Sequence, residues 1–541
     1  MNRNFLTLLL VVALAAPVTA QSESCDSSCD DGACKVVIAM PCDPCDTVVT
    51  SRTHFTDRPL FGLCSPERES LYRNRAIARE DGCQSAVQAV IFGGRTTDRG
   101  RMATYFTPFG KSELRVKSAG DLTFGERDAD VLVEYFNVFV NNQDAYKSII
   151  RFAPRQSVVG GGFTFDHRFA ECEETGRAFT FNLAFSVQRV KNTMGFSETI
   201  INDGGGVLTD LPAGVVVAGN MEEAFKQASW ECGKIDCACE KAKTRLASIE
   251  ANVGYEVLNH DTCKLESYFG ISLPTGNKVR STFLYEPIIG QEKHVGLMFG
   301  TKGSMHLWDD EARDASLTYH FHISGQYLVR NKQHRLIDIV NKPWSRFMRM
   351  YKDRDQALLA ITNDDPFLYT PGVNILCRSV KVKPGFTRTF NTALTYERCN
   401  VVAEAGYTFF ARPDECVELE CPWEPTAAII SVEGSTPGNV DRVQQINDNF
   451  DGLNNSLAQQ IAGGGDLIDY YNDHVITECD LDLVSAAHPC MTSHTVYGTL
   501  GYKWDDREYP ILVATGGSYE FGPHNNTANR WTIWAKAGLS W

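Results

Sequence analysis

The last twelve residues of the chain alternate between one face that is apolar throughout and a second face of mostly polar or small side chains. A period of two is the period of a β-strand, whose successive side chains point to opposite faces. A chain end stays mobile unless other structure holds it, so an amphipathic strand at the terminus must pair with and bury against the rest of the molecule. The apolar face carries Trp531, Ile533, Ala535, Ala537, Leu539 and Trp541, and the opposite face carries Thr532, Trp534, Lys536, Gly538 and Ser540.

The same period returns along the chain from about residue 85 onward. Many of these segments span about 10–14 residues, which exceeds the five or six of an average soluble strand and suits a tilted strand that crosses a membrane. Stretches with helical character separate them at 221–243 and 344–361, and a long polar run occupies 422–473. We predict an all-β fold, an antiparallel transmembrane β-barrel of about 12 strands (range 10–16) with long, partly helical loops. The predicted strands cover 158–170, 177–188, 247–257, 265–273, 294–308, 316–329, 386–397, 401–411, 494–504, 509–521 and 530–541.

Residues 1–20 have the pattern of a cleavable secretory signal. A basic start precedes an apolar run from Phe5 to Val18, and small residues follow at the expected cleavage point before Gln21. The apolar run is short for the ~20 residues of a membrane-spanning helix, which disfavours the alternative of a permanent anchor. We therefore expect an exported protein with three parts: the signal at 1–20, a cysteine-rich N-terminal segment at 21–84 and the barrel at 85–541.

The net charge and the cysteine content limit the kinds of partner and of covalent link that we expect for this protein. The formal net charge of -15 disfavours nucleic acid. All 18 cysteines follow the predicted signal, and an exported chain meets oxidising conditions, so disulfides are the first expectation. Cys42 and Cys45 form a CxxC motif, for which structural or intermolecular disulfides come first and a metal site or redox chemistry remain alternatives. The pairing of the cysteines cannot be read from their spacing.

A membrane barrel has no free edge, because lipid cannot satisfy unpaired backbone groups, so the last strand must pair with the first. Trp541 is then expected to anchor the barrel at the membrane interface. An amphipathic terminal strand that ends in an aromatic residue resembles the bacterial outer-membrane β-barrel family, in which the barrel assembly machinery recognises this signature. The resemblance does not identify a subfamily. It implies a bacterial outer-membrane location and contact with outer-membrane lipid.

The cysteine content departs from most members of that family. It resembles instead the cysteine-rich major outer-membrane porins that stabilise their envelope by disulfide cross-linking. This second resemblance implies disulfide-linked envelope proteins or a homo-oligomer as partners.

Seven polar side chains fall on the strand faces predicted to point into the lumen. His320 and His322 lie two residues apart on one such face, near Asp309, Asp310 and Asp314, and a metal site is the alternative to simple lining of the lumen. A polar barrel interior needs such side chains in any case. The candidate lumen-facing residues are Glu250, Glu256, Lys264, Glu266, His320, His322 and Lys536.

Motifs of catalysis and of cofactor binding are not expected in this chain. It lacks the GxSxG motif of serine hydrolases. The glycine runs at 160–162, 204–206 and 463–465 lack the Lys-Ser/Thr of a phosphate loop, so we expect them to serve as hinges or to allow close packing of strands. The leading hypothesis is a porin-like channel for passive diffusion of ions and small solutes. The alternatives are a non-conducting outer-membrane scaffold or adhesin cross-linked by disulfides, and a secreted β-rich binding protein.

Overall fold

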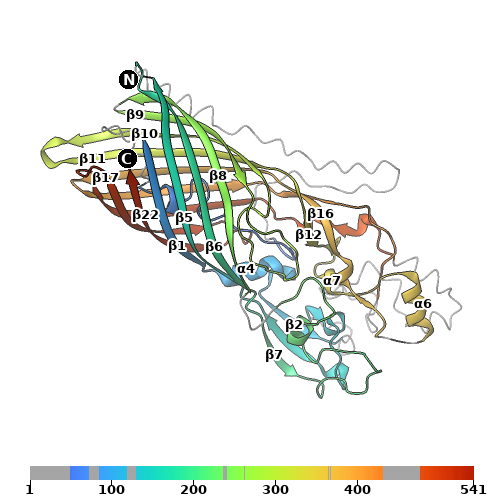
Figure 1. Ribbon diagram of the computed structural model, residues 1–541. Helices are drawn as coiled ribbons and strands as arrows, with labels where there is room; N and C mark the ends of the chain where they lie inside the picture. The colour runs from blue at the N-terminus through green and yellow to red at the C-terminus, as the bar shows by residue number, and fades with distance from the viewer. Residues whose placement is uncertain are drawn as a thin grey trace. The chain divides into compact units, whose positions relative to one another are not determined.

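A computed structural model describes residues 49–71, 84–118, 129–172, 174–235, 241–260, 262–363, 365, 367–430 and 475–541. A closed antiparallel barrel of 12 strands dominates this part of the chain (Figure 1). The predicted fold class is thus confirmed. The barrel strands are β1 (Ser85–Thr96), β5 (Arg155–Cys172), β6 (Arg177–Thr193), β8 (Lys241–His260), β9 (Cys263–Leu273), β10 (Gly296–Asp310), β11 (Ala315–Leu328), β17 (Phe386–Arg398), β18 (Val401–Arg412), β22 (Met491–Trp504), β23 (Ile511–Phe521) and β24 (Arg530–Ser540).

The first and last strands close the barrel. β1 pairs with β24 over eleven residue pairs, from Ala86 opposite Ser540 to Thr96 opposite Arg530. The backbone of Trp541 continues this ladder, since its N–H donates to the Ser85 carbonyl at 3.0 Å. β24 and Trp541 therefore complete a hydrogen-bonded seam with β1.

Burial alternates along β24 as the sequence predicts. Ile533 is 58% exposed on the outside, whereas Lys536 is 3% exposed on the inside. β1 was not among the predicted strands, and the reason is physical. Its inner face carries Val90 and Phe92, so both of its faces are apolar and the polar alternation is lost.

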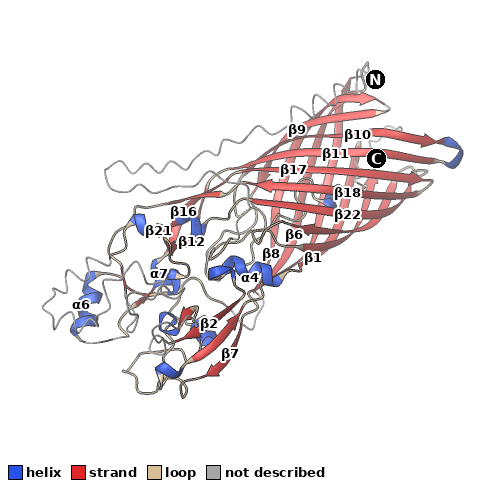
Figure 2. Cartoon of the chain, turned by 180° about the vertical axis from the view of Figure 1, so that it is seen from behind, coloured by secondary structure: helices blue, strands red, loops and turns tan. Residues whose placement is uncertain are grey.

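The two ends of the barrel differ in their connections. At one end, here the turn end, short turns join β5 to β6, β8 to β9, β10 to β11, β17 to β18 and β22 to β23. Trp541 and the start of β1 lie at the same end. At the other end, the loop end, the connections after β1, β6, β9, β11 and β18 are long, and those after β1, β6, β11 and β18 carry secondary structure of their own (Figure 2).

These long connections, together with the short one between β23 and β24, form the cap, which comprises the described residues of 97–154, 194–240, 274–295, 329–385, 413–490 and 522–529. A core of buried aromatic residues holds it together, including Phe136, Phe225, Trp230, Trp344 and Phe347. Its sheets are β2 (Glu113–Lys117), β3 (Val131–Leu132), β4 (Lys147–Arg151) and β7 (Ser197–Asn202); β12 (Asn331–Leu336), β16 (Cys377–Pro384) and β19 (Glu415–Leu419); β13 (Asp338–Ile339) and β21 (Leu481–Asp482); and β14 (Arg349–Tyr351), β15 (Thr370–Pro371) and β20 (Ala428–Ile429).

The helices of the cap are short, namely α4 (Arg99–Phe106), α5 (Met221–Ala224), α6 (Arg354–Thr362) and α7 (Gly372–Ile375). α5 and α6 fall within the two stretches for which helical character was predicted. Among the helices of the described residues, none has the length and apolar composition needed to cross a membrane. Most of the predicted loop 422–473 lies outside the described residues.

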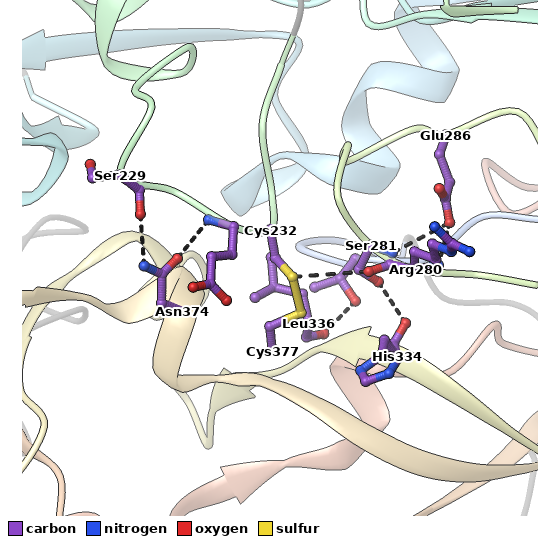
Figure 3. Close-up of a disulfide and its surroundings, with 11 residues drawn as sticks. Ser229, Cys232, Arg280, Ser281, Glu286, His334, Leu336, Asn374 and Cys377 are labelled. Atoms are coloured by element: carbon purple, nitrogen blue, oxygen red, sulfur yellow. Dashed lines mark hydrogen bonds between the residues drawn. A yellow bond between two sulfur atoms is a disulfide. The ribbon is translucent and has the colours of Figure 1, made fainter.

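A disulfide joins Cys232 to Cys377 across 145 residues of the chain, and it ties the β6–β8 connection to β16 (Figure 3). Asn374 fastens the same place, because its side chain donates to the Ser229 carbonyl at 2.8 Å and accepts from the Glu231 N–H at 2.7 Å. Three further cap cysteines, Cys416, Cys479 and Cys490, are also disulfide-bonded. The CxxC motif of Cys42 and Cys45 lies outside the described residues.

Five other cysteines of the described chain form no disulfide within it. Cys172, Cys263 and Cys399 lie in or beside three different hairpin turns at the turn end. Cys421 is exposed in the cap, and Cys64 is fully buried.

Candidate functional site: the barrel lumen and the segment inside it

Residues 49–71, here the luminal segment, lead from the cap into the barrel. At the cap, the Asn525 side chain accepts from the Val49 N–H at 3.2 Å and donates to the Val49 carbonyl at 2.6 Å. Farther along, Arg58 pairs with Glu520, near the loop end of β23. At the far end of the segment, the Leu71 N–H donates to Glu404 of β18 at 3.0 Å. The segment thus runs through the lumen from the loop end toward the turn end.

The deepest part of the luminal segment is sealed from solvent. Cys64 is 0% exposed and Arg68 is 2% exposed. Ser65 precedes a single helical turn, α2 (Pro66–Glu69), and proline suits this first helical position because it has no N–H that would need a partner. The turn directs the Arg68 side chain at the barrel wall.

Arg68 is the main polar link between the segment and the wall. Its guanidinium donates to Glu250 of β8 at 2.5 Å and to Asn182 of β6 at 3.0 Å. Its carbonyl accepts from Gln88 of β1 at 3.1 Å and from Lys536 of β24 at 3.3 Å. Removing either charge of such a buried pair would leave the other uncompensated, so these contacts fix the segment in place.

A second set of charges holds the segment at the loop end. The Glu520 carboxylate accepts from Arg58 at 2.9 Å, from Arg530 at 2.5 Å and from Ser493 at 2.8 Å. Asp57, outside the strands, lies beside this group, and its burial raises the pKa of its carboxyl to about 6 in spite of the opposing effect of Arg530.

Apolar contacts complete the fit on one side of the lumen. The Phe61 ring stacks on Phe92 of β1, with centroids 5.8 Å apart and planes 6° from parallel. Gly162 of β5 makes room for Phe61, since a Cβ at this glycine would lie 2.3 Å from the Phe61 Cζ. A Cβ at Gly160 would likewise lie 2.6 Å from the Phe92 ring. Gly162 therefore serves close packing against the luminal segment, and Gly160 serves close packing against Phe92 of β1.

All seven predicted lumen residues lie on the inner side of the barrel. Glu250 and Lys536 contact the luminal segment directly. Lys536 also donates to the Ser70 carbonyl at 2.5 Å. Glu256 pairs with Arg168 at 3.0 Å, and Glu266 pairs with Lys302 at 3.1 Å.

The two histidines take separate roles. The His322 ring meets the Tyr268 hydroxyl at 2.7 Å and lies 3.4 Å from the Glu69 carboxylate of the luminal segment. His320 lines a cavity beside it. Asp310 and Asp314 lie at the β10–β11 turn, several residues along the strand from these rings, and His306 is the histidine that pairs with Asp309. Within the described chain, the group of side chains with metal-ligand geometry lies elsewhere, at His54, Glu292 and Glu415.

A cavity remains between α2 and the turn end of the lumen. Its empty volume is about 660 Å³, including the part open to solvent. Charges of both signs line it, as do aliphatic parts of the wall. The charged and titratable lining residues are Glu69, Glu256, Lys264, Glu266, Lys302, His320 and His322.

Sequence reasoning did not anticipate the luminal segment. It assigned these residues to the cysteine-rich N-terminal segment 21–84, and their sequence shows neither helical nor strand periodicity. Two sequence features did reflect its presence, namely an unexplained glycine run in β5 and apolar residues on both faces of β1. These features can be interpreted only with Phe61 of the luminal segment, which lies about 30 to 100 residues earlier in the chain.

No protein-family model matches the sequence, and no curated protein matches it. Among solved structures, an outer-membrane channel from Pseudomonas putida F1 shares 6% identity, covers 85% of this chain and 97% of its own, and gives a TM-score of 0.37. The β-domain of the Bordetella autotransporter BrkA shares 7%, with coverages of 85% and 100% and a TM-score of 0.30. A FadL homologue from Pseudomonas aeruginosa shares 9%, with coverages of 92% and 98% and a TM-score of 0.29.

Proposed function

We propose that this protein is an outer-membrane channel for ions and small solutes that its own luminal segment holds closed. The observation that carries the proposal is the burial of that segment inside the closed barrel. Its side chains and backbone form hydrogen bonds or ion pairs with β1, β6, β8, β11, β18, β23 and β24. A free passage at this level would require the segment to move, so passive diffusion through an always-open lumen is replaced by gated diffusion.

The outer surface supports a membrane location. An aliphatic band occupies the middle of the strands, with exposed residues such as Ile91, Val159, Leu500, Val513 and Ile533. Exposed aromatic residues flank this band toward both ends, as expected at the two membrane interfaces. A secreted soluble protein would rarely expose so large an apolar surface. The aromatic residues include Phe179, Tyr255, Tyr396, Tyr502 and Trp541 toward the turn end, and Tyr327, Tyr519, Phe521 and Trp531 toward the loop end.

The chemistry of the contact suits a segment that can leave. Leu60 and Phe61 of the segment pack against apolar residues of the wall. Arg58, Arg68 and Glu69 meet the wall through polar groups, whereas a permanent core would be built from interlocking apolar side chains alone. Water can take over these polar contacts when the segment departs. The polar wall left behind, with Glu250, Glu520 and Lys536, is the kind of lining that an aqueous channel requires.

A second function has one specific observation in its favour. The cap has its own aromatic core and the Cys232–Cys377 disulfide, which a simple channel does not need. A non-conducting scaffold or adhesin would use the cap as its binding surface and keep the luminal segment as permanent filling.

An engineered lock distinguishes the two. Cys64 Sγ of the segment lies 3.3 Å from Ser324 Oγ of β11, so Ser324→Cys should form a disulfide with Cys64. We would record single-channel conductance of the refolded protein in planar bilayers, before and after reduction. The channel proposal expects silence in the oxidised Ser324→Cys protein and discrete openings after reduction.

The controls decide what a negative result means. Cys64→Ser/Ser324→Cys cannot form the lock and should open equally under both conditions. Deletion of residues 55–71, with barrel formation checked by heat-modifiable gel mobility, should leave a constantly open pore. A deletion variant that forms the barrel but stays silent would overturn the channel and support the scaffold. Equal conductance with the lock closed or reduced would show that the segment is not the gate.

A further inference from the structure

Three buried side chains from distant parts of the chain converge where the luminal segment meets the cap. His54 belongs to the segment, Glu292 to the β9–β10 connection, and Glu415 is the first residue of β19. One nitrogen or oxygen of each lies within 4.8 Å of the others. The closest pair is His54 Nε2 and Glu292 Oε1, at 3.0 Å.

Neighbouring donors bind one oxygen of each carboxylate. Arg335 donates to Glu292 Oε2 at 3.0 Å, and its Nη2 lies 3.3 Å from Glu415 Oε2. Gln333 also donates to Glu292 Oε2, at 3.2 Å, and the His488 backbone N–H donates to Glu415 Oε2 at 3.0 Å. These donors orient both carboxylates in the way that outer partners orient the ligands of a metal.

The remaining oxygens have different surroundings. Glu292 Oε1 meets His54, but the buried Glu415 Oε1 has no hydrogen-bond partner in the protein. A buried carboxylate oxygen without a partner is costly, and a bound cation would satisfy it.

We propose that His54, Glu292 and Glu415 bind a divalent transition-metal ion of the zinc class. Imidazole nitrogen and carboxylate oxygen are both zinc ligands, and three protein ligands leave a fourth position for water. Two ligand atoms about 2.1 Å from a tetrahedral ion lie roughly 3.4 Å apart. This value falls between the 3.0 Å that separates His54 from Glu292 and the 4.8 Å within which all three ligand atoms lie. The imidazole of His54 favours a zinc-class ion over Ca²⁺ or Mg²⁺, because the latter two prefer oxygen ligands.

The position of the site suggests what the ion would do. His54 precedes Arg58 and Arg68 in the luminal segment, whereas Glu292 and Glu415 belong to the cap. An ion shared by the three would tie the segment to the cap and hold the lumen closed. We call this role of the ion, which holds the lumen closed, the latch. Metal binding itself does not depend on conduction, but the latch rests on the proposed function.

Metal titration of the full-length, refolded and chelator-treated protein tests the site. We expect zinc to bind with 1:1 stoichiometry beyond any thiol sites, as measured by calorimetry and metal content. Glu415→Gln and His54→Gln should each weaken this binding at least 10-fold. His334→Gln is the matched control, since His334 is an exposed cap histidine outside the cluster. Cobalt provides a second measurement, because cysteine ligands would add a sulfur-to-cobalt charge-transfer band that this site should not show.

The outcomes separate the ion from the gate. Zinc uptake that is unchanged in both Glu415→Gln and His54→Gln, or cobalt bound only through sulfur, would overturn the site and leave a His54–Glu292 ion pair. If zinc binds as expected and also lowers the open probability of the channel, the latch is supported. Binding without any change in the open probability would remove the latch but keep the site. A barrel that is silent under all conditions, including after deletion of residues 55–71, would refute the proposed function while the titration still decides the site.

Discussion

The lumen and the cap both contain buried residues, but different interactions hold these residues in place. In the cap, Phe136, Phe225, Trp230, Trp344 and Phe347 pack ring against ring. In the lumen, buried charges bind the segment, as Arg68 does with Glu250. The difference follows from the structures that enclose the buried residues in the two regions. Backbone hydrogen bonds hold a closed barrel whatever fills it, so its interior can remain polar, whereas the small sheets of the cap need an apolar core to stay together.

The cysteines divide in the same way. Cys232 and Cys377 are bonded in the cap, where Cys416, Cys479 and Cys490 also form disulfides. Cys64 in the lumen is reduced. Disulfides therefore reinforce the cap, which has no continuous sheet. The described cysteines of the barrel and its lumen form none.

The largest effect should come from breaking the cap core. Trp344 is buried, its indole N–H donates to the Phe106 carbonyl at 2.8 Å, and its ring meets Phe347 at 5.3 Å. Trp344→Ala should destabilise the cap by about 4–5 kcal/mol, from lost packing and an unpaired carbonyl. Limited proteolysis should then cut the cap while the barrel keeps its heat-modifiable gel mobility. Loss of the barrel in the same variant would show that the two regions are not independent.

Breaking the lumen contact should have the next largest effect. Arg68→Ala removes one partner of a buried ion pair and should weaken the hold on the segment by about 4 kcal/mol. Labelling of Cys64 by a water-soluble thiol reagent measures this, since Cys64 is fully buried in the native protein. Arg68→Leu/Glu250→Leu, which removes both charges, should label more slowly than Arg68→Ala. The same labelling rate in both variants would mean that the charge pair does not hold the segment.

Removing the cross-link should affect only the cap. Cys232→Ser opens a bridge that spans 145 residues, and the free energy of unfolding of the cap should fall by about 3 kcal/mol. Cys421→Ser is the control, because this exposed cysteine is already free and its loss should change nothing. The thermal unfolding of the cap, followed by near-ultraviolet circular dichroism, would measure both. A shift in Cys64 labelling would contradict the division between the two regions.

The smallest effect should come from Asp57, where the two regions meet. Its folded-state pKa is raised to about 6, so the protonated form is favoured and its contribution to stability is lost as the pH rises from about 4 through 6. A shift of about two pKa units corresponds to roughly 2–3 kcal/mol at most. Asp57→Asn should remove this part of the pH dependence, as measured by thermal unfolding in detergent at pH 4.5, 6 and 7.5. An unchanged pH profile would count against the raised pKa.

The barrel could be predicted from the sequence because its strands carry the information locally. In β24, most residues show by their own polarity which way they face, with Trp534 on the inner side as the exception. The luminal segment could not be predicted, because its structure depends on distant partners. Arg58 and Glu520 are 462 residues apart, and Arg68 and Glu250 are 182 residues apart. The seven lumen residues could be assigned to the inner face, but their partners on the segment could not.

The tether between the luminal segment and the wall has a further consequence. Only residues 72–84 separate Leu71 from β1, so the segment is a ligand attached to its own receptor. A short covalent connection gives such a ligand an effective concentration in the millimolar range. Dilution of the protein therefore cannot empty the lumen. Under the proposed function, a solute or a second protein that opens the channel would have to compete against this local concentration. After it leaves, the lumen would close again at a rate that does not depend on how many copies the membrane holds.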